Sequence, residues 1–163
     1  MIRLIAAVDQ KMGIAKQGRQ PWSLPADEQY FREQTMRHGG VLLMGRKTHE
    51  VISRALPRRI SYVLSRDPQA TDTAPAIDSV HFIPDPQLAV QKHPDLWVIG
   101  GADVYRQLLP QADELYLTII AADFGCDQFF PGFADQGFIQ VSRSLQYIEN
   151  GLAYRYEVYT KAP

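Results

Sequence analysis

Short, uninterrupted apolar runs recur along this chain and constrain its fold more than any other feature. The first covers residues 1–8, in which Arg3 is the one charged residue, and unbroken runs follow at 41–44 and 96–99. An apolar run of this length is typical of a strand that is covered on both faces, as in a parallel sheet. Polar stretches that include helix-compatible segments lie between the runs, so strands and helices should alternate.

The full pattern predicts one α/β domain over residues 1–163. We expect a mainly parallel central sheet of about eight strands, with an antiparallel C-terminal strand and flanking helices. The expected strands are 1–8, 41–44, 60–65, 80–83, 96–99, 114–121, 138–147 and 153–160. The expected helices are 25–38, 46–54, 87–92 and 102–109. Residues 9–23 should form a long loop, which in a compact domain usually serves as a lid or binding segment.

Charge and cysteine content narrow the function classes. Lys plus Arg (17) nearly balances Asp plus Glu (18), so no basic excess points to nucleic acid or to a membrane surface. Cys126 is the single cysteine, which excludes an intramolecular disulfide and suits the reducing cytoplasm. No apolar run approaches the roughly 20 residues of a membrane span. We therefore expect a cytoplasmic protein that is a monomer and whose partners are small molecules.

Several chemistries lack their sequence signatures. The four histidines stand far apart without a ligand-like pair, so we expect no metal site. Neither a GxSxG nor a GxGxxG motif is present. The segment at 40–48 (GVLLMGRKT) has some likeness to a P-loop, but Arg46 separates the glycine from Lys47 and the intervening residues resemble a strand.

Two strand-to-helix junctions have the composition of phosphate-binding turns. At Gly45-Arg46-Lys47-Thr48 and at Gly100-Gly101-Ala102, glycine allows close approach to backbone N–H groups at a helix start. Either junction alone is more often an ordinary β-to-α turn. Both should lie at the same edge of the sheet, and together they favour a pyrophosphate site.

The cations near these junctions indicate which dinucleotide is bound. Arg46, Ser65 and Arg66 are expected at neighbouring strand ends. Arginines there accommodate a ribose 2′-phosphate, whereas an acid would select the free hydroxyl, so the sequence favours NADPH over NADH. Asp67 follows the strand end and should face solvent.

Asp27 is the second candidate site residue. It lies in the first turn of an expected helix, near Trp22, Leu24 and Phe31. An acid at a helix start often serves only to complement the helix dipole. The aromatic surroundings favour another interpretation, in which a flat heterocycle is held between apolar side chains and binds the carboxylate through its N–H groups.

Six motifs in order and spacing resemble the dihydrofolate reductase family, and the resemblance covers nearly the whole chain. They are 21–27 (PWSLPAD), Phe31, 44–48 (MGRKT), 56–59 (LPRR), 98–105 (VIGGADVY) and 115–118 (LYLT). Each motif is modest alone, but six in register are specific. The resemblance implies hydride transfer from NADPH to C6 of 7,8-dihydrofolate with protonation at N5. The product would be tetrahydrofolate, which feeds one-carbon and thymidylate metabolism.

The resemblance also implies roles for particular residues. Asp27, Trp22 and Thr118 would be catalytic, and Arg59 would hold the substrate's α-carboxylate. The substrate site would consist of Ile5, Leu24, Asp27, Glu28, Phe31, Ile52, Leu56, Arg59, Ile99 and Thr118. The cofactor site would consist of Ala7, Gly45, Arg46, Lys47, Thr48, Leu64, Ser65, Arg66, Ile99, Gly100, Gly101, Ala102, Val104 and Tyr105, with a cis peptide between Gly100 and Gly101. Antifolates would be inhibitors.

Some residues depart from the family pattern, and two other function classes remain open. Glu28 stands where the family usually has an apolar residue, the lid around Met12, Gly13 and Ile14 is altered, and Cys126 replaces a usual glycine. One alternative is a pyrimidine reductase of the riboflavin pathway, although Asp27 and Arg59 speak against it. The other is a non-catalytic nucleotide-binding module, which would not need an acid at Asp27.

Overall fold

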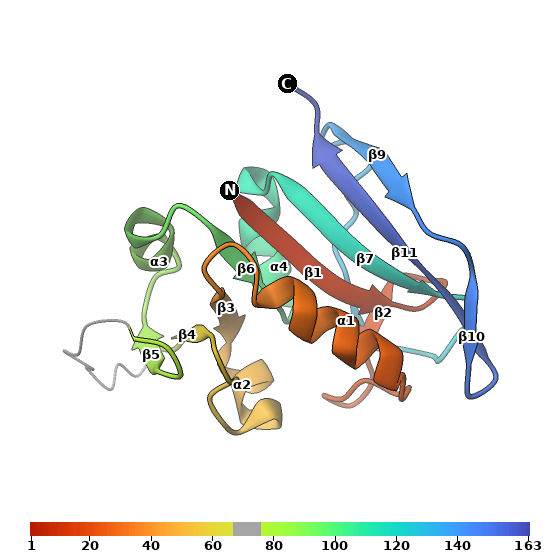
Figure 1. Ribbon diagram of the computed structural model, residues 1–163, viewed down its shortest axis with the longest axis horizontal. Helices are drawn as coiled ribbons and strands as arrows, with labels where there is room; N and C mark the ends of the chain where they lie inside the picture. The colour runs from red at the N-terminus through yellow and green to blue at the C-terminus, as the bar shows by residue number, and fades with distance from the viewer. Residues whose placement is uncertain (67–75) are drawn as a thin grey trace.

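The computed structural model describes residues 1–66 and 76–163, and our expectation for Asp67 falls outside these ranges. A nine-stranded sheet runs through the molecule in the order β10-β11-β7-β1-β6-β3-β4-β5, and β9 also pairs with β11 (Figure 1). Its strands are β1 (Ile2–Val8), β3 (Val41–Gly45), β4 (Ile60–Leu64), β5 (Val80–Ile83), β6 (Leu96–Val98), β7 (Glu114–Ile120), β9 (Phe138–Arg143), β10 (Tyr147–Glu149) and β11 (Leu152–Lys161).

Most of the sheet is parallel, as the sequence predicts. The pairings of β1 with β6 and β7, of β3 with β4 and β6, and of β4 with β5 are all parallel. Only β11 introduces antiparallel pairing, with β7 on one side and with β9 and β10 on the other. All seven residues of β1 are buried, because both faces of the sheet are covered. The predicted fold class is therefore confirmed.

Helices cover the two faces of the sheet. The helices are α1 (Pro25–Thr35), α2 (Arg46–Ile52), α3 (Gln87–Lys92), α4 (Ala102–Leu108) and a 3-10 turn, η1 (Leu109–Gln111). In Figure 1, α1 lies in front of the sheet and α4 behind it. The front face packs Tyr30 and Phe31 of α1 and Ile52 of α2 against the sheet. The rear face packs the buried side chains of α4 and Ala89 of α3.

Two short strands occur where the sequence gives no signal. Within the predicted loop 9–23, β2 (Gly13–Ala15) pairs with β8 (Gln128–Phe129), more than 100 residues away. Segments of three and two residues show no periodicity, and only their mutual hydrogen bonds make them strands. The prediction that residues 9–23 are entirely loop is therefore wrong in this detail.

The C-terminal segment also differs in detail. The single strand expected over 138–147 is two strands, β9 and β10, interrupted at residues 144–146. Ser144 leaves the strand because its backbone N–H binds the Tyr156 carbonyl and its Oγ accepts from the Tyr156 N–H, which turns the chain. No helix of the described residues has the length and apolar character needed to cross a membrane.

Candidate active site

The first turn of α1 brings Asp27 to the sheet. Pro25 occupies the first helical position, where its missing N–H is not needed. Asp27 then faces β7, and Thr118 Oγ1 donates a hydrogen bond to Asp27 Oδ1 over 2.6 Å. Thr118 is buried and is the register partner of Ala7 on β1 and of Tyr156 on β11. The structure thus unites the two polar residues that the sequence proposes as catalytic.

The surroundings of Asp27 favour its protonated form. Burial is the largest influence, the nearby charges of Glu28 and Glu149 act in the same direction, and the net effect raises the pKa of Asp27 to about 6. The hydrogen bond from Thr118 stabilises the carboxylate and so opposes the shift. A carboxyl group with this pKa can hold a proton near neutral pH, as a general acid must. Glu28 itself is exposed.

An apolar wall flanks the acid. Trp22 and Leu24 pack with Ala7 in one buried cluster, next to Tyr154. The Trp22 ring also contacts Phe124 at a centroid distance of 5.3 Å. Within the described part of the chain, the buried indole N–H of Trp22 has no acceptor. It is therefore a donor without a partner in a cluster that also packs Ala26, the residue before Asp27.

A second apolar cluster contains the other predicted substrate residues. Phe31, Ile52 and Leu56 pack from one side onto Ile5 and Ile99 of the sheet. These side chains come from α1, from the α2 region and from two adjacent parallel strands, so only the tertiary fold brings them together. They supply the apolar lining that small-molecule sites need.

Arg59 is a buried cation beyond this cluster. Only 3% of its surface is exposed, and it donates from Nη1 to Thr35 Oγ1 (2.9 Å) and from Nε to the Pro57 carbonyl (3.0 Å). None of the ion pairs among residues 1–66 and 76–163 includes it. Burial lowers the pKa of Arg59, and the charges of Arg32 and Arg54 lower it further. A buried guanidinium in this situation is suited to an anionic ligand.

The two glycine junctions meet at one edge of the sheet. The Gly45 N–H donates to the Gly100 carbonyl over 2.8 Å, and the Gly100-Gly101 peptide is cis, as the resemblance implies. A Cβ on Gly101 would meet only Thr48 Oγ1, at 3.6 Å, so this backbone is open to a ligand. Neither α2 nor α4 has a side-chain cap at its start.

The remaining predicted cofactor residues surround this edge. Tyr105 donates from its hydroxyl to the Ile5 carbonyl over 2.6 Å, which joins α4 to β1. Leu64 is the register partner of Gly45. Ala102 and Val104 are buried in α4, and Ser65 is buried after β4, whereas Lys47 and Arg66 are exposed. Arg46 is also exposed and pairs with Glu50 at 3.3 Å.

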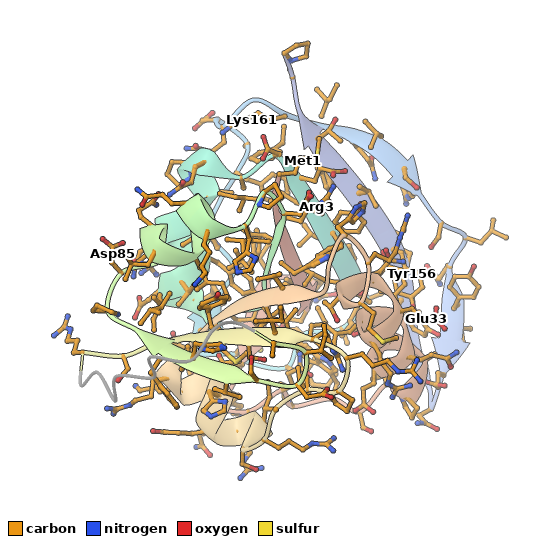
Figure 2. The ribbon with its side chains drawn as sticks, turned by 60° about the vertical axis from the view of Figure 1, so that its left-hand side comes forward. Met1, Arg3, Glu33, Asp85, Tyr156 and Lys161 are labelled. Atoms are coloured by element: carbon orange, nitrogen blue, oxygen red, sulfur yellow. The ribbon has the colours of Figure 1, made fainter. Side chains whose placement is uncertain are left out.

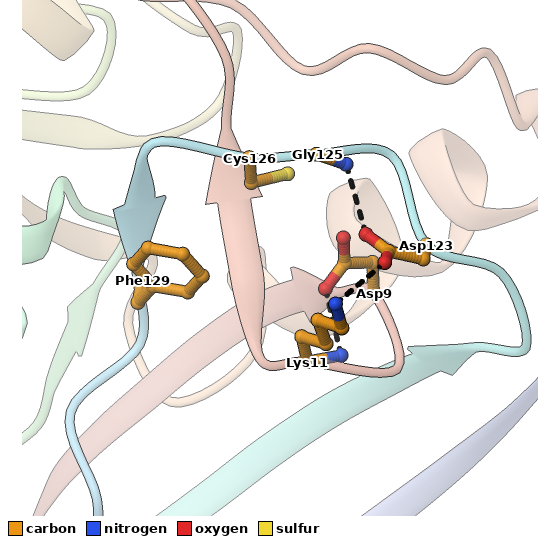
Figure 3. A pocket seen from close by; sticks show the side chains of 6 residues that line it. All are labelled: Asp9, Lys11, Asp123, Gly125, Cys126 and Phe129. Carbon is orange, nitrogen blue, oxygen red and sulfur yellow. Dashed lines mark hydrogen bonds and ion pairs between the residues drawn. The ribbon is translucent and has the colours of Figure 1, made fainter.

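A separate cavity of about 230 Å³ lies between the predicted lid and the 121–130 loop. Figure 3 shows its lining, in which Lys11 forms an ion pair with Asp123 (2.9 Å) and Cys126 lies next to β2. Buried Asp9 accepts hydrogen bonds from the N–H groups of Lys11, Gly13 and Phe124 and so connects the two loops. The cavity contains neither Asp27 nor the glycine junctions, so it is not the proposed active site.

Sequence reasoning missed several residues that shape the site. Tyr156 stacks on Tyr30 at 4.0 Å and fixes α1 to β11, and Glu149 accepts a hydrogen bond from the Ala26 N–H. The sequence-based predictions also lack a role for Asp9, which connects the lid to the 121–130 loop outside the proposed active site. A usable signal existed only for Asp9, an acid that ends an apolar strand and precedes a glycine by four residues.

Fold and site define a class of protein: an α/β enzyme that binds a nucleotide at the carboxyl ends of parallel strands, next to a half-buried acid. The dihydrofolate reductase family model matches residues 1–161. Dihydrofolate reductase type 3 of Salmonella typhimurium is 36% identical to this chain, and the match covers 98% of this chain and 96% of that protein. Dihydrofolate reductase of Bacillus subtilis (strain 168) is 35% identical to this chain, and the match covers 96% of this chain and 91% of that protein.

A solved structure shows the same relationship. The dihydrofolate reductase from Enterococcus faecalis complexed with NADP(H) and RAB-propyl superposes with a TM-score of 0.82 at 32% identity, over all of this chain and 97% of that one. The chain belongs to the dihydrofolate reductase family.

Proposed function

We propose that this chain reduces 7,8-dihydrofolate to 5,6,7,8-tetrahydrofolate with NADPH, by hydride transfer to C6 and protonation at N5. The observation that carries the proposal is the hydrogen bond from buried Thr118 to half-buried Asp27, whose partial burial raises the pKa of the acid to about 6. A nucleotide-binding module without catalysis would have no use for a proton held in an apolar pocket. Family membership supports the same reaction class.

Asp27 would act on the pteridine end of the substrate. Its Oδ1 is held by Thr118, which fixes the direction of the carboxyl group. The remaining oxygen would bind the N–H edge of the heterocycle and support protonation at N5. The unpaired indole N–H of Trp22 would bind a polar group on the same side, and Leu24 would exclude bulk water.

Arg59 would bind the opposite end of the substrate. Two of its five N–H donors are occupied by Thr35 and Pro57, so others remain for a bidentate carboxylate. Between the two ends, the apolar cluster would cover the middle of the molecule, through Ile5, Phe31, Ile52, Leu56 and Ile99. The exposed Glu28 would lie at the rim.

The glycine junctions fit a dinucleotide. The backbone at Gly101 is open on the side of Thr48, and the Gly45–Gly100 hydrogen bond holds the two junctions together. The phosphates would be held by Gly45, Arg46, Lys47, Thr48, Ser65, Arg66, Gly100, Gly101 and Ala102. The nicotinamide would be bordered by Ile5, Ala7, Ile99 and Tyr105, and Leu64 and Val104 would contact other parts of the cofactor. When bound there, NADPH supplies the hydride.

The test is the loss of NADPH absorbance with dihydrofolate as the only added acceptor. Parallel reactions use NADH, and use a ribosylated aminopyrimidine in place of dihydrofolate. We expect rapid oxidation of NADPH with dihydrofolate and a kcat/KM with NADH that is about a hundredfold lower, since charge-assisted contacts to a 2′-phosphate contribute about 3 kcal/mol. Turnover of the pyrimidine instead of dihydrofolate would contradict the proposal.

We further propose that the chain is one domain over residues 1–163 and a cytoplasmic monomer that binds small molecules, including antifolate inhibitors. The balanced charge supports small-molecule partners, and the single cysteine supports the reducing cytoplasm. Light scattering coupled to gel filtration tests the oligomeric state, with one 18.5 kDa species expected.

A further inference from the structure

The β10–β11 hairpin reaches the start of the helix that bears Asp27. Glu149, the last residue of β10, accepts a hydrogen bond from the Ala26 N–H through Oε1 over 3.1 Å. Leu24, at the N-cap position, makes no side-chain cap, and Pro25 has no N–H. The Asp27 N–H bonds to the Leu24 carbonyl. Ala26 therefore carries the first-turn donor that this helix cannot satisfy itself, and a distant segment supplies the acceptor.

The position of Glu149 is fixed by its strand. Asn150 and Gly151 both have positive φ (51° and 75°), as a tight two-residue hairpin turn requires. Glu149 faces Leu152 as the closing pair of that turn. Strand β11 then continues from the hairpin and pairs with β7, which carries Thr118.

One continuous sheet thus holds the first turn of α1 at two adjacent residues. Thr118 binds the Asp27 side chain, and Glu149 binds the backbone of Ala26. The stacking of Tyr30 on Tyr156 adds a third contact one turn further along the helix. A shift of the hairpin would therefore be transmitted to the acid.

The charge of Glu149 also acts on Asp27. The titratable and polar groups around Asp27 come from α1, β7, β10 and β11, and they are Glu28, Tyr30, Thr118, Glu149, Tyr154 and Tyr156. In the described part of the chain, no cation is among these groups. Glu149 raises the pKa of Asp27 and thereby favours its proton, and Thr118 has the opposite effect.

We propose that Glu149 is a positioning residue for Asp27, which fixes the first turn of α1 against the sheet and maintains a negative charge beside the acid. The role assigned to Asp27 rests on the proposed function, whereas the contact itself does not. Two substitutions separate the two effects. Glu149→Gln keeps an acceptor for the Ala26 N–H and removes the charge, and Glu149→Ala removes both.

A matched control exists at another helix. Asp85 accepts a hydrogen bond from the first N–H of α3, at Gln87, over 2.9 Å. Figure 2 shows Asp85 on the opposite side of the molecule from Tyr156. Asp85→Asn therefore removes one carboxylate charge from a helix start that is remote from Asp27.

The pKa of Asp27 is measured by carboxyl ¹³C NMR in the ligand-free protein and from the pH profile of single-turnover hydride transfer. We expect Glu149→Gln to lower it by about half a unit, since one charge is lost at short range, and to slow hydride transfer about threefold on the alkaline side. Glu149→Ala should give the same shift, faster amide exchange at Ala26 and a lower Tm. Asp85→Asn should leave the profile unchanged.

Each outcome has a definite meaning. A lower Tm without any movement of the Asp27 titration would show that Glu149 is merely structural and would overturn the proposal. A shift of the Asp27 pKa of equal size in Asp85→Asn would overturn the proposal as well, because loss of any carboxylate charge would then have the same effect. The NMR titration remains informative even if dihydrofolate is not reduced, so failure of the proposed function is distinguished from failure of this inference.

Discussion

Replacing Arg59 by methionine tests whether its buried charge serves ligand binding or the fold. In the free protein Arg59 is 3% exposed, and its guanidinium is bound by the Thr35 hydroxyl and the Pro57 carbonyl, without a carboxylate from residues 1–66 or 76–163. Arg32 and Arg54 add repulsion. If the group served stability alone, an acidic partner would be expected, because an unpaired buried charge is costly.

The magnitude follows from the contacts. Methionine fills the space of the aliphatic stem, so the variant loses two neutral-acceptor hydrogen bonds but also an unfavourable charge. Thr35 keeps its own hydrogen bond to the Phe31 carbonyl, at 2.7 Å. We expect the free energy of unfolding to stay within about 1 kcal/mol of the parent. Dihydrofolate binding should weaken by about 1.5–3 kcal/mol, or about 10- to 150-fold in Kd, because a charge-assisted clamp is lost.

The assay compares two ligands on three proteins. Kd values for dihydrofolate and for a pterin that lacks the glutamate tail are measured by fluorescence titration on the parent, Arg59→Met and the control Arg54→Met. Arg54 is exposed, so its loss should cost less than about threefold. The tail-less pterin should bind parent and Arg59→Met equally. Equal weakening of both ligands, or weakened NADPH binding, would refute the assignment of Arg59 to the substrate tail.

Three further predictions concern the acid, the lid and pH. Asp27→Asn should slow hydride transfer about a hundredfold at pH 7, with partial recovery at low pH, in stopped-flow measurements. A Cβ on Gly13 would collide with the Cβ of Cys126 and lie 2.7 Å from its Sγ. Gly13→Ala should therefore lower the free energy of unfolding, measured in urea, by about 1–3 kcal/mol. Adding Cys126→Gly to this variant should restore most of the loss. Burial, with repulsion by a nearby lysine, lowers the pKa values of His81 and His93 below 6.5. As the pH falls, these histidines therefore take up protons in the unfolded chain before they do so in the folded protein, and the free energy of unfolding should decrease below pH 6.5. In a His81→Gln, His93→Gln double variant this decrease should be less steep. The contribution of Asp27, which has the opposite sign, is the same in both proteins.

The sequence predicts the sheet well because most of its strands have a local sequence pattern. Each long buried strand is an apolar run, and β1 and β3 lie within a residue or so of the predicted bounds. Strands β2 and β8 are different, since nothing in residues 13–15 or 128–129 marks them, and their pairing depends on the fold as a whole. The same holds for the split between β9 and β10, which two hydrogen bonds between Ser144 and Tyr156 impose.

In the site, too, the residues with a local sequence signal can be predicted, and those positioned by distant contacts cannot. Asp27 could be proposed because its neighbours in sequence are also its neighbours in space, and Gly45 and Gly100 because strand ends converge in any parallel sheet. Glu149 could not be proposed, since it approaches Ala26 across 123 residues and has no local signature. Contacts of this kind become visible only when the strand register is known.

Buried charge distinguishes the site from the scaffold. Arg3, on β1, is 5% exposed and is neutralised by Asp95 (2.8 Å) and Glu114 (3.0 Å), and Asp9 accepts three backbone N–H groups. These groups are satisfied in the free protein, as stability requires. Arg59 has no carboxylate among the described residues, and Asp27 is held by one hydroxyl in a setting that disfavours its charge. Their deficits are of opposite sign and lie at the two ends of α1, because Asp27 is in its first turn and Arg59 binds Thr35, its last residue. A ligand with an N–H donor edge and a distant carboxylate would complete this arrangement.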